Sequence, residues 1–190
     1  VLTVSAEHIS HRLQGLLSSG TNSLKVDDAG RIVGSWKALA KLGLEEDIDS
    51  DLSPMRRAVA FCQVIEAQNR GTKHKVSSKQ ISGMFQQVVE AYQKAELKEG
   101  RDHGTLIYEA EHIDGSMNAS QKEQKINWLK EKTPENTCRI LSNVRCLSEG
   151  VDVPALDAVL FLTPRNSQVD VVQSVGRVMR NASGKQRDYV

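Results

Sequence analysis

The chain has 190 residues, of which 39% are hydrophobic, and its formal net charge is +1. This length fits one folded domain with additional segments, and the near-neutral charge excludes a globally basic nucleic-acid-binding protein, so any nucleic-acid surface must be local. No apolar run approaches the length of a membrane span and no signal peptide is apparent, so we expect no association with a membrane.

The first 54 residues are predicted to form a helical linker or extension from a preceding domain. Apolar residues recur at helical spacing between residues 29 and 40. Asp27 or Asp28 is placed to cap the start of this helix, and Gly43 is placed to end it. The chain starts without methionine and ends on an apolar pair that resembles the opening of a strand, so we expect a piece of a longer protein.

From residue 55 onward, short apolar strands alternate with amphipathic helices. Strands are expected at residues 58–64, 107–113, 138–142 and 158–163. One helix is expected to start at a capping box formed by Ser77 and Gln80, and its apolar stripe consists of Ile81, Met84, Phe85, Val88, Val89 and Tyr92. A second helix is expected to be capped by Ser120 and to run through Lys130. Further helices are expected over residues 145–148 and 168–181. This alternation predicts an α/β fold in which helices cover a parallel sheet.

The most informative segment is the octapeptide from Gln173 to Arg180, Gln-Ser-Val-Gly-Arg-Val-Met-Arg. On a helix, Gln173, Gly176, Arg177 and Arg180 share one stripe, while apolar residues fill the opposite side. Two guanidiniums one turn apart suit a polyphosphate better than a single carboxylate. The simpler alternative is a surface helix whose arginines pair with acidic side chains, so the context has to decide.

The context is a second segment upstream, Glu149–Pro154, which reads Glu-Gly-Val-Asp-Val-Pro. These two segments, in this order and at this separation, resemble motifs V and VI of superfamily 2 helicases. Arg57–Cys62 is similar to helicase motif IV, and His112–Met117 resembles the family segment that follows it. Ser142–Gly150 also resembles helicases that are attached to bacterial restriction-modification enzymes.

The resemblance implies that residues 55–190 are the second RecA-like domain of a two-domain motor, truncated at its C-terminus. In such a motor, this domain supplies arginine fingers that neutralise charge on the transferred phosphoryl group. By position, the resemblance assigns that catalytic role to Arg177 and Arg180. It assigns nucleotide contacts to Gln173, Gly176, Glu149, Gly150 and Asp152.

These assignments have simpler alternatives that the sequence leaves open. Gly150 could be a helix C-cap, Asp152–Pro154 could be an ordinary turn, and Glu149 could be a solvent-exposed acid. Asp152 is the candidate for contacts with the ribose hydroxyls.

ATP and Mg²⁺ are the cofactors that the family resemblance implies for the whole protein. The sequence contains neither a Gly-x-x-x-x-Gly-Lys-Ser/Thr loop nor an acidic magnesium motif. Both are expected in an N-terminal RecA-like lobe of the same protein, so this chain alone is expected to be inactive.

Nucleic acid, most simply duplex DNA, is the expected partner, although the sequence does not distinguish DNA from RNA. Polar groups at strand ends can contact phosphates, which makes Gln63, Ser142, Asn143 and Arg145 candidates. Lys73 and Lys75 belong to a basic loop that could follow a duplex backbone, or that could simply be solvated.

We expect no metal site in this chain, because its histidines and cysteines lack metal-ligand spacing. Cys62, Cys138 and Cys146 lie in apolar segments, which favours buried thiols in a reducing compartment such as the bacterial cytoplasm. The alternative to a helicase lobe is a non-motor α/β module whose arginine helix binds a phosphorylated ligand or a protein carboxylate.

Overall fold

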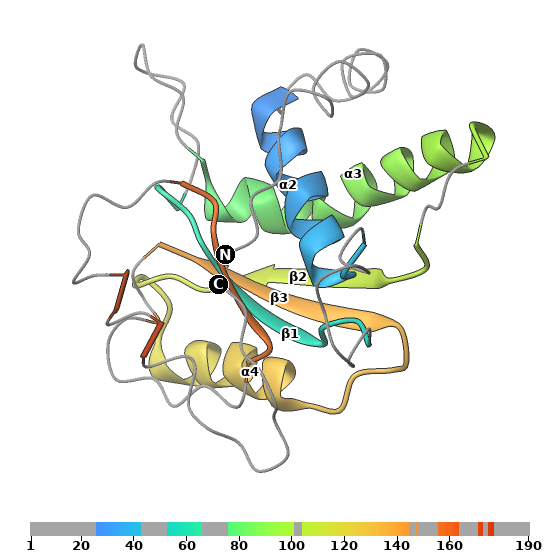
Figure 1. Ribbon diagram of the computed structural model, residues 1–190. Coiled ribbons are helices and arrows are strands. Elements are labelled where there is room, and N and C mark those ends of the chain that lie inside the picture. Colours follow the sequence, from blue (N-terminus) through green and yellow to red (C-terminus); the bar gives the residue numbers. More distant parts are fainter. Residues whose placement is uncertain are drawn as a thin grey trace.

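The computed structural model describes residues 26–42, 53–65, 76–100, 104–144, 147, 156–163, 171–172 and 175–176. Its centre is a sheet of four parallel strands in the order β2-β3-β1-β4 (Figure 1). The strands are β1 (Arg57–Phe61), β2 (Ile107–His112), β3 (Thr137–Asn143) and β4 (Ala158–Phe161). This arrangement confirms the predicted α/β fold with a parallel, helix-covered sheet.

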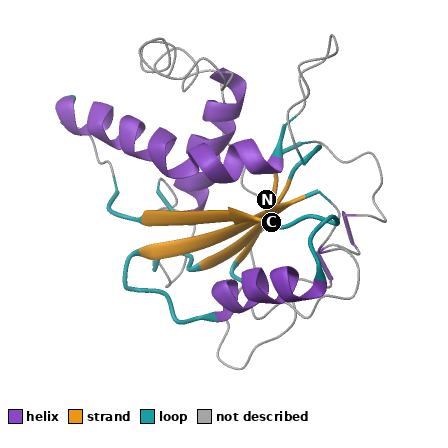
Figure 2. Ribbon diagram, turned by 180° about the vertical axis from the view of Figure 1, so that it is seen from behind, coloured by secondary structure: helices purple, strands orange, loops and turns teal. Residues whose placement is uncertain are grey.

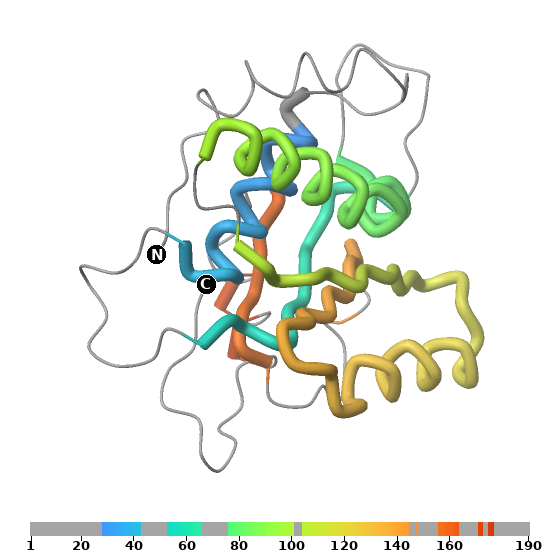
Figure 3. Tube along the Cα trace, turned by 90° about the vertical axis from the view of Figure 1, so that its right-hand side faces the viewer, coloured from blue at the N-terminus to red at the C-terminus, as the bar shows by residue number. Residues whose placement is uncertain are grey.

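In the described part of the chain, three helices cover the two faces of the sheet. Helices α2 (Val26–Leu39) and α3 (Ser78–Lys98) lie on one face, and α4 (Ala119–Lys130) lies on the other (Figure 2). The view along the sheet in Figure 3 shows the same separation of α2 and α3 from α4. Strand β2 therefore follows a helix on one face and precedes a helix on the other.

The alternation of side chains along each strand produces two hydrophobic clusters. On β3, Cys138 and Ile140 join the cluster under α2 and α3, whereas Leu141 joins the cluster under α4. On β1, Ala60 and Phe61 divide in the same way. Because successive side chains of a strand point to opposite faces, each strand contributes to both clusters.

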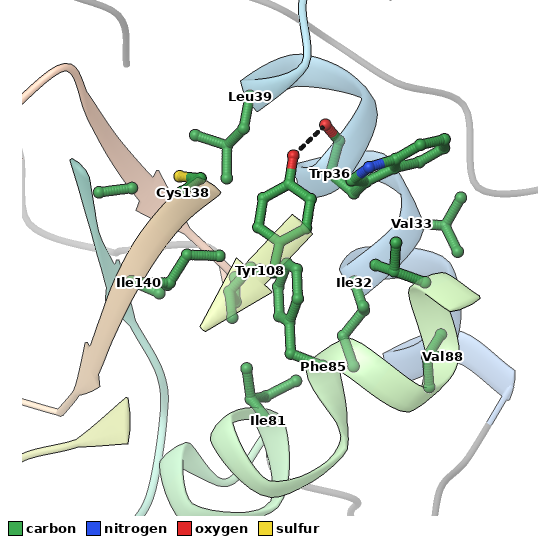
Figure 4. Packing of buried hydrophobic residues seen from close by; sticks show 14 of the residues in the cluster. Ile32, Val33, Trp36, Leu39, Ile81, Phe85, Val88, Tyr108, Cys138 and Ile140 are labelled. Atoms are coloured by element: carbon green, nitrogen blue, oxygen red, sulfur yellow. Dashed lines mark hydrogen bonds between the residues drawn. The ribbon is translucent and has the colours of Figure 1, made fainter. Parts of the chain in front are cut away.

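Helix α2 packs into the hydrophobic cluster that lies between the sheet and α3. The apolar residues at the predicted spacing within this helix are fully buried: Ala29, Ile32, Val33, Trp36 and Leu39. Ala40, also predicted as part of this stripe, follows the last helical residue and is half-buried. The Tyr108 hydroxyl of β2 donates to the Trp36 carbonyl oxygen at 3.2 Å (Figure 4). The Trp36 ring also packs edge-on against Tyr92 of α3, with the ring centroids 5.8 Å apart.

The starts and ends of the helices differ in part from the predictions. Helix α2 already contains Val26, so Asp27 and Asp28 lie within it and neither caps it. Asp28 is buried and pairs instead with Arg31 of the next turn at 2.7 Å. After α2, Lys41 adopts a left-handed conformation with φ of 56°, while Gly43 lies outside the described residues.

The predicted cap of α4, Ser120, is wrong, because Asn118 caps this helix. The Asn118 side chain accepts the Gln121 backbone N–H at 2.9 Å, and the Gln121 side chain accepts the Asn118 N–H at 3.0 Å. This reciprocal pair satisfies two N–H groups that would otherwise lack partners, and it places Ser120 inside the first turn.

The amino edge of the sheet, where the parallel strands begin, is held by two arginines that are register partners, Arg57 and Arg139. Arg57 Nη2 donates to the carbonyl oxygens of Lys130 and Glu131 at 3.0 and 3.1 Å. Arg139 Nη1 donates to the carbonyl oxygen of Trp128. Both guanidiniums therefore cap the last carbonyls of α4.

Other groups at the amino edge are paired as well. Arg139 Nε donates to Glu109 Oε2 at 2.8 Å, and its guanidinium lies 5.0 Å from the centroid of the Trp128 ring. The Asp157 carboxylate accepts the backbone N–H groups of Arg56 and Arg57 at 2.8 and 3.0 Å, which ties β4 to β1.

Strand β2 lies at one edge of the described sheet. Its odd-numbered residues hydrogen-bond with β3, as in the Ile107 N–H to the Asn136 carbonyl oxygen at 2.7 Å. The Tyr108 N–H points away from β3, and the Gln86 side chain of α3 accepts it at 2.9 Å.

Candidate functional site

The candidate site is built at the carboxyl edge of the sheet, where the parallel strands end. Gln63 follows β1, His112 ends β2 and Asn143 ends β3. The register pairs Phe61 with Asn143 and His112 with Ser142, so these positions adjoin across the strands. Ligands of open α/β sheets bind at this edge, so the location fits the predicted polar contacts.

Ser142 connects three elements at this edge. Its side chain is buried, with 1% exposure. Its hydroxyl donates to the carbonyl oxygen of Ser78, the first residue of α3, at 2.9 Å. The same hydroxyl lies 3.1 Å from the carbonyl oxygen of Glu111 on β2. The hydroxyl proton is thus shared between two backbone acceptors inside the protein.

Asn143 connects β3 to β1. Its backbone carbonyl oxygen accepts the Cys62 N–H at 2.7 Å, and its Nδ2 donates to the Ala60 carbonyl oxygen at 3.3 Å. The side chain is fully buried, and its Oδ1 has no hydrogen-bond partner among the described residues. A buried amide oxygen in this state is an acceptor available to a donor that approaches the strand end.

The start of α3 is fixed to the segment that follows β1. Ser77 caps the helix by accepting the Gln80 N–H at 3.4 Å, and its hydroxyl donates to the Ile65 carbonyl oxygen at 2.8 Å. The Ser78 N–H donates to the Val64 carbonyl oxygen at 2.8 Å. The predicted strand 58–64 therefore ends early, at Phe61, because residues 63 and 64 turn to pair with Val76.

The turn after β2 contains an ionisable pair. His112 Nε2 lies 3.5 Å from Asp114 Oδ2, and Asp114 Oδ1 accepts from the Ser116 hydroxyl and N–H at 2.5 and 2.8 Å. Hydrogen bonding by Ser116 lowers the pKa of Asp114, so this carboxylate is ionised near neutrality.

The same turn shifts His112 in the direction of its neutral form. Burial lowers the pKa of His112, and Asp114 partly opposes that effect. Lys79 and Lys125 add to the lowering, and Glu111 opposes it. The sequence predicts no site residue in this turn, although the resemblance of His112–Met117 to a helicase segment is a signal that points to it.

The described residues account for part of the predicted site. They bring Ser142 and Asn143 together with Gln63, which is exposed after β1. Gly176 is helical and exposed, and a Cβ built there would meet no heavy atom of the described chain within 4 Å. The remaining predicted residues lie outside the described residues: Lys73, Lys75, Arg145, Glu149, Gly150, Asp152, Gln173, Arg177 and Arg180.

Within the described ranges, no group of three or more His, Cys, Asp or Glu residues is arranged to hold a metal ion. Over the same ranges, no helix combines the length and the apolar character needed to cross a bilayer.

Burial raises the pKa of Cys138, and the nearby Asp157 adds to this effect, so this thiol is protonated and unreactive.

Comparisons with known proteins agree with the fold. The helicase conserved C-terminal domain matches residues 55–182. A solved structure, the ATP-dependent Type ISP restriction-modification enzyme LlaBIII bound to DNA, is 39% identical in sequence with a TM-score of 0.75. The match covers 97% of this chain and 11% of that one. This similarity identifies the sheet as RecA-like.

Two curated viral proteins that are assigned as helicases also match. One, from Sulfolobus islandicus filamentous virus, is 28% identical over 90 residues, which is 47% of this chain and 15% of that protein. The other, from African swine fever virus, is 53% identical over 38 residues, which is 20% of this chain and 4% of that protein. The chain thus spans only a small part of the length of these relatives.

Proposed function

Since this chain belongs to the family of helicase conserved C-terminal domains, we propose that it is the second motor lobe of an ATP-dependent DNA helicase or translocase. The match of residues 55–182 carries the proposal, because it includes both the strand-end residues and the segment from Gln173 to Arg180. The similarity to a Type ISP enzyme supports a restriction-modification setting, and hence the bacterial cytoplasm.

In this proposal the lobe supplies half of an ATP site. Arg177 and Arg180 act as arginine fingers on the transferred phosphoryl group. Gln173, Gly176, Glu149, Gly150 and Asp152 contact the nucleotide. The loop that cradles the phosphates and the acid that holds Mg²⁺ come from an N-terminal RecA-like lobe, so the chain by itself hydrolyses no ATP.

The nucleic-acid face in this proposal lies along the carboxyl edge of the sheet. Gln63 is exposed there, and Asn143 offers a buried acceptor at the adjoining strand end. In sequence, Arg145 comes shortly after β3, which ends at this edge, and Lys73 and Lys75 come shortly before α3, which begins there. Duplex DNA is the proposed partner, which is consistent with the DNA-bound state of the similar Type ISP enzyme.

The proposal is tested by replacing the two arginines in the whole protein. We expect Arg177→Ala and Arg180→Ala each to lower kcat for ATP by about 10³-fold or more, with ATP binding largely intact, because a finger acts mainly on the transition state. Lysine should restore little activity, since it lacks the planar fork of donors. Turnover and nucleotide affinity are measured side by side.

Arg56→Ala serves as the matched control. Arg56 is an exposed arginine at the opposite edge of the sheet, and its replacement should leave turnover unchanged. Near-normal turnover in both finger variants would mean that these arginines are structural, and ATP hydrolysis by this chain alone would contradict the half-site.

A further inference from the structure

Ser142 was expected to contact nucleic acid, yet its surroundings are those of an internal joint. The side chain is 1% exposed, and its hydroxyl donates to the carbonyl oxygens of Ser78 and Glu111 at 2.9 and 3.1 Å. A phosphate could accept this proton only after the start of α3 had separated from β3. The described geometry therefore favours a role inside the protein over direct contact.

The joint connects elements that flank the proposed nucleic-acid face. The start of α3 follows the segment that contains Lys73 and Lys75 and is held to the end of β1 by Ser77. A carbonyl has two lone pairs, so Ser78 can accept the Ser142 hydroxyl in addition to its helical hydrogen bond. The Ile113 N–H donates to the Ser142 carbonyl oxygen at 2.9 Å, which adds the turn after β2.

On the other side, β3 leads directly toward the proposed nucleotide contacts. The chain passes from Asn143 to Glu149 through Leu147, which is buried in the cluster under α4. A displacement of the end of β3 would therefore be passed directly along the chain to the segment from Glu149 to Asp152. Coupling between two sites requires an element whose position depends on both.

We propose that Ser142 is a positioning residue of the motor lobe, whose hydroxyl makes the start of α3 and the ends of β2 and β3 move as one body. Nucleic acid that displaces the start of α3 then displaces β3, and with it the residues that face the nucleotide. This inference rests on the proposed function of the lobe. A positioning role predicts that Ser142 affects the stimulation of the ATPase by nucleic acid but not the affinity for nucleic acid, whereas a direct contact would affect the affinity.

The test measures ATPase rate against DNA concentration for the whole protein with Ser142→Ala. We expect the maximal stimulation by DNA to fall about fivefold or more, because buried hydrogen bonds of ordinary strength are lost from the coupled state. The DNA concentration for half-maximal stimulation should change by less than about twofold. Ser142→Thr should restore the stimulation, because it keeps the hydroxyl on a side chain suited to a strand.

Cys138→Ala is the matched control. Cys138 lies on the same strand and the same face, is fully buried, and loses one side-chain heavy atom as Ser142 does. It should leave the stimulation intact. Equal effects of the two variants would reduce Ser142 to a packing residue, and full maximal stimulation at a raised half-maximal DNA concentration would make it a direct contact.

A second measurement separates this inference from the proposed function. Hydrogen exchange of this chain reports the joint directly, and in Ser142→Ala the amides of Ile81 and Ile113 should exchange about fivefold faster than in the native chain. Amides of α4 should be unchanged. A native enzyme without DNA stimulation would refute the motor, whereas unchanged exchange at Ile81 and Ile113 would refute the joint.

Discussion

The two edges of the sheet differ in how far their buried polar side chains are paired. At the amino edge, Arg57 and Arg139 donate to the last carbonyls of α4, and Asp157 accepts two backbone N–H groups. At the carboxyl edge, Asn143 Oδ1 and His112 Nε2 are buried without a hydrogen-bond partner in the described chain. Arg57 Nε at the amino edge is also buried without a hydrogen-bond partner within the described ranges, but that guanidinium is held by two other hydrogen bonds, whereas Oδ1 is the only acceptor atom of the Asn143 side chain.

The difference indicates where stability and function reside. Burying a polar atom without a hydrogen bond costs free energy, so such atoms are rare where a structure serves only stability. Their presence at strand ends is what a site for a ligand or a moving segment requires. The amino edge is therefore expected to respond to mutation mainly in stability, and the carboxyl edge mainly in activity.

The largest stability effect is expected at Arg139. Arg139→Met keeps much of the side-chain length but leaves Glu109 and the Trp128 carbonyl oxygen without this donor, and should lower the free energy of unfolding by about 2–3 kcal/mol. Urea unfolding of the chain measures it. Arg56→Met, at an exposed arginine nearby, should change the free energy by less than about 0.5 kcal/mol. Equal effects at both positions would mean that the amino edge is not a clamp.

In contrast to Arg139, replacement of Asn143 should change activity more than stability. Asn143→Ala loses one long hydrogen bond and also removes an unpaired oxygen, so the free energy of unfolding should fall by about 1 kcal/mol or less. In the whole protein, stimulation of the ATPase by nucleic acid should fall more than the basal rate, and titration with DNA compares the two. Arg145→Ala should behave likewise if Arg145 contacts phosphate.

Asn118 supplies the control for Asn143, because it is also an asparagine near the carboxyl edge. Asn118→Ala removes a helix cap and should cost about 1 kcal/mol of stability without any change in stimulation. If Asn143→Ala lowers basal and stimulated rates equally, or if Asn118→Ala lowers the stimulation as well, the carboxyl edge has no special role in coupling.

The smallest effect concerns pH and His112. Because the pKa of His112 is lowered in the folded chain, the unfolded chain binds this proton first as the pH falls. Stability from this group is therefore complete above a pH of about 6.5 and is lost as the pH falls toward the lowered folded pKa. Asp114 titrates in a separate window, below the usual carboxyl range.

His112→Gln removes this titration. Urea unfolding at pH 7.5 and 5.5 should show a smaller loss of stability at the lower pH in the variant than in the native chain. An identical pH dependence in the two chains would show that the environment of His112 does not favour its neutral form.

Much of the fold follows from spacing alone. The apolar stripes of α2 and α3 were predicted residue by residue, because a helix buries one face at a period of 3.6 residues. The strand cores were predicted because short apolar runs between helices fit a buried parallel sheet. Helix starts were less certain, since Asn118 and Ser120 are both good capping residues and only the reciprocal bond with Gln121 decides between them.

The site was predictable in location but less so in the roles of its residues. The position of Ser142 and Asn143 at the end of an expected strand predicted a contact role for both, and both lie at the carboxyl edge. It could not show that the Ser142 hydroxyl points inward to Ser78, because a contact between residues this far apart in sequence depends on how α3 packs on the sheet. The roles of Arg177, Arg180 and the other residues outside the described ranges stay predictions.

The Gln86 side chain has a consequence for the behaviour of the lobe at high concentration. An edge strand offers unpaired N–H and C=O groups that can recruit another strand and start aggregation. By accepting the outward N–H of Tyr108, Gln86 occupies one of these groups on β2. A helix side chain thus protects part of this edge of the described sheet from pairing with another strand.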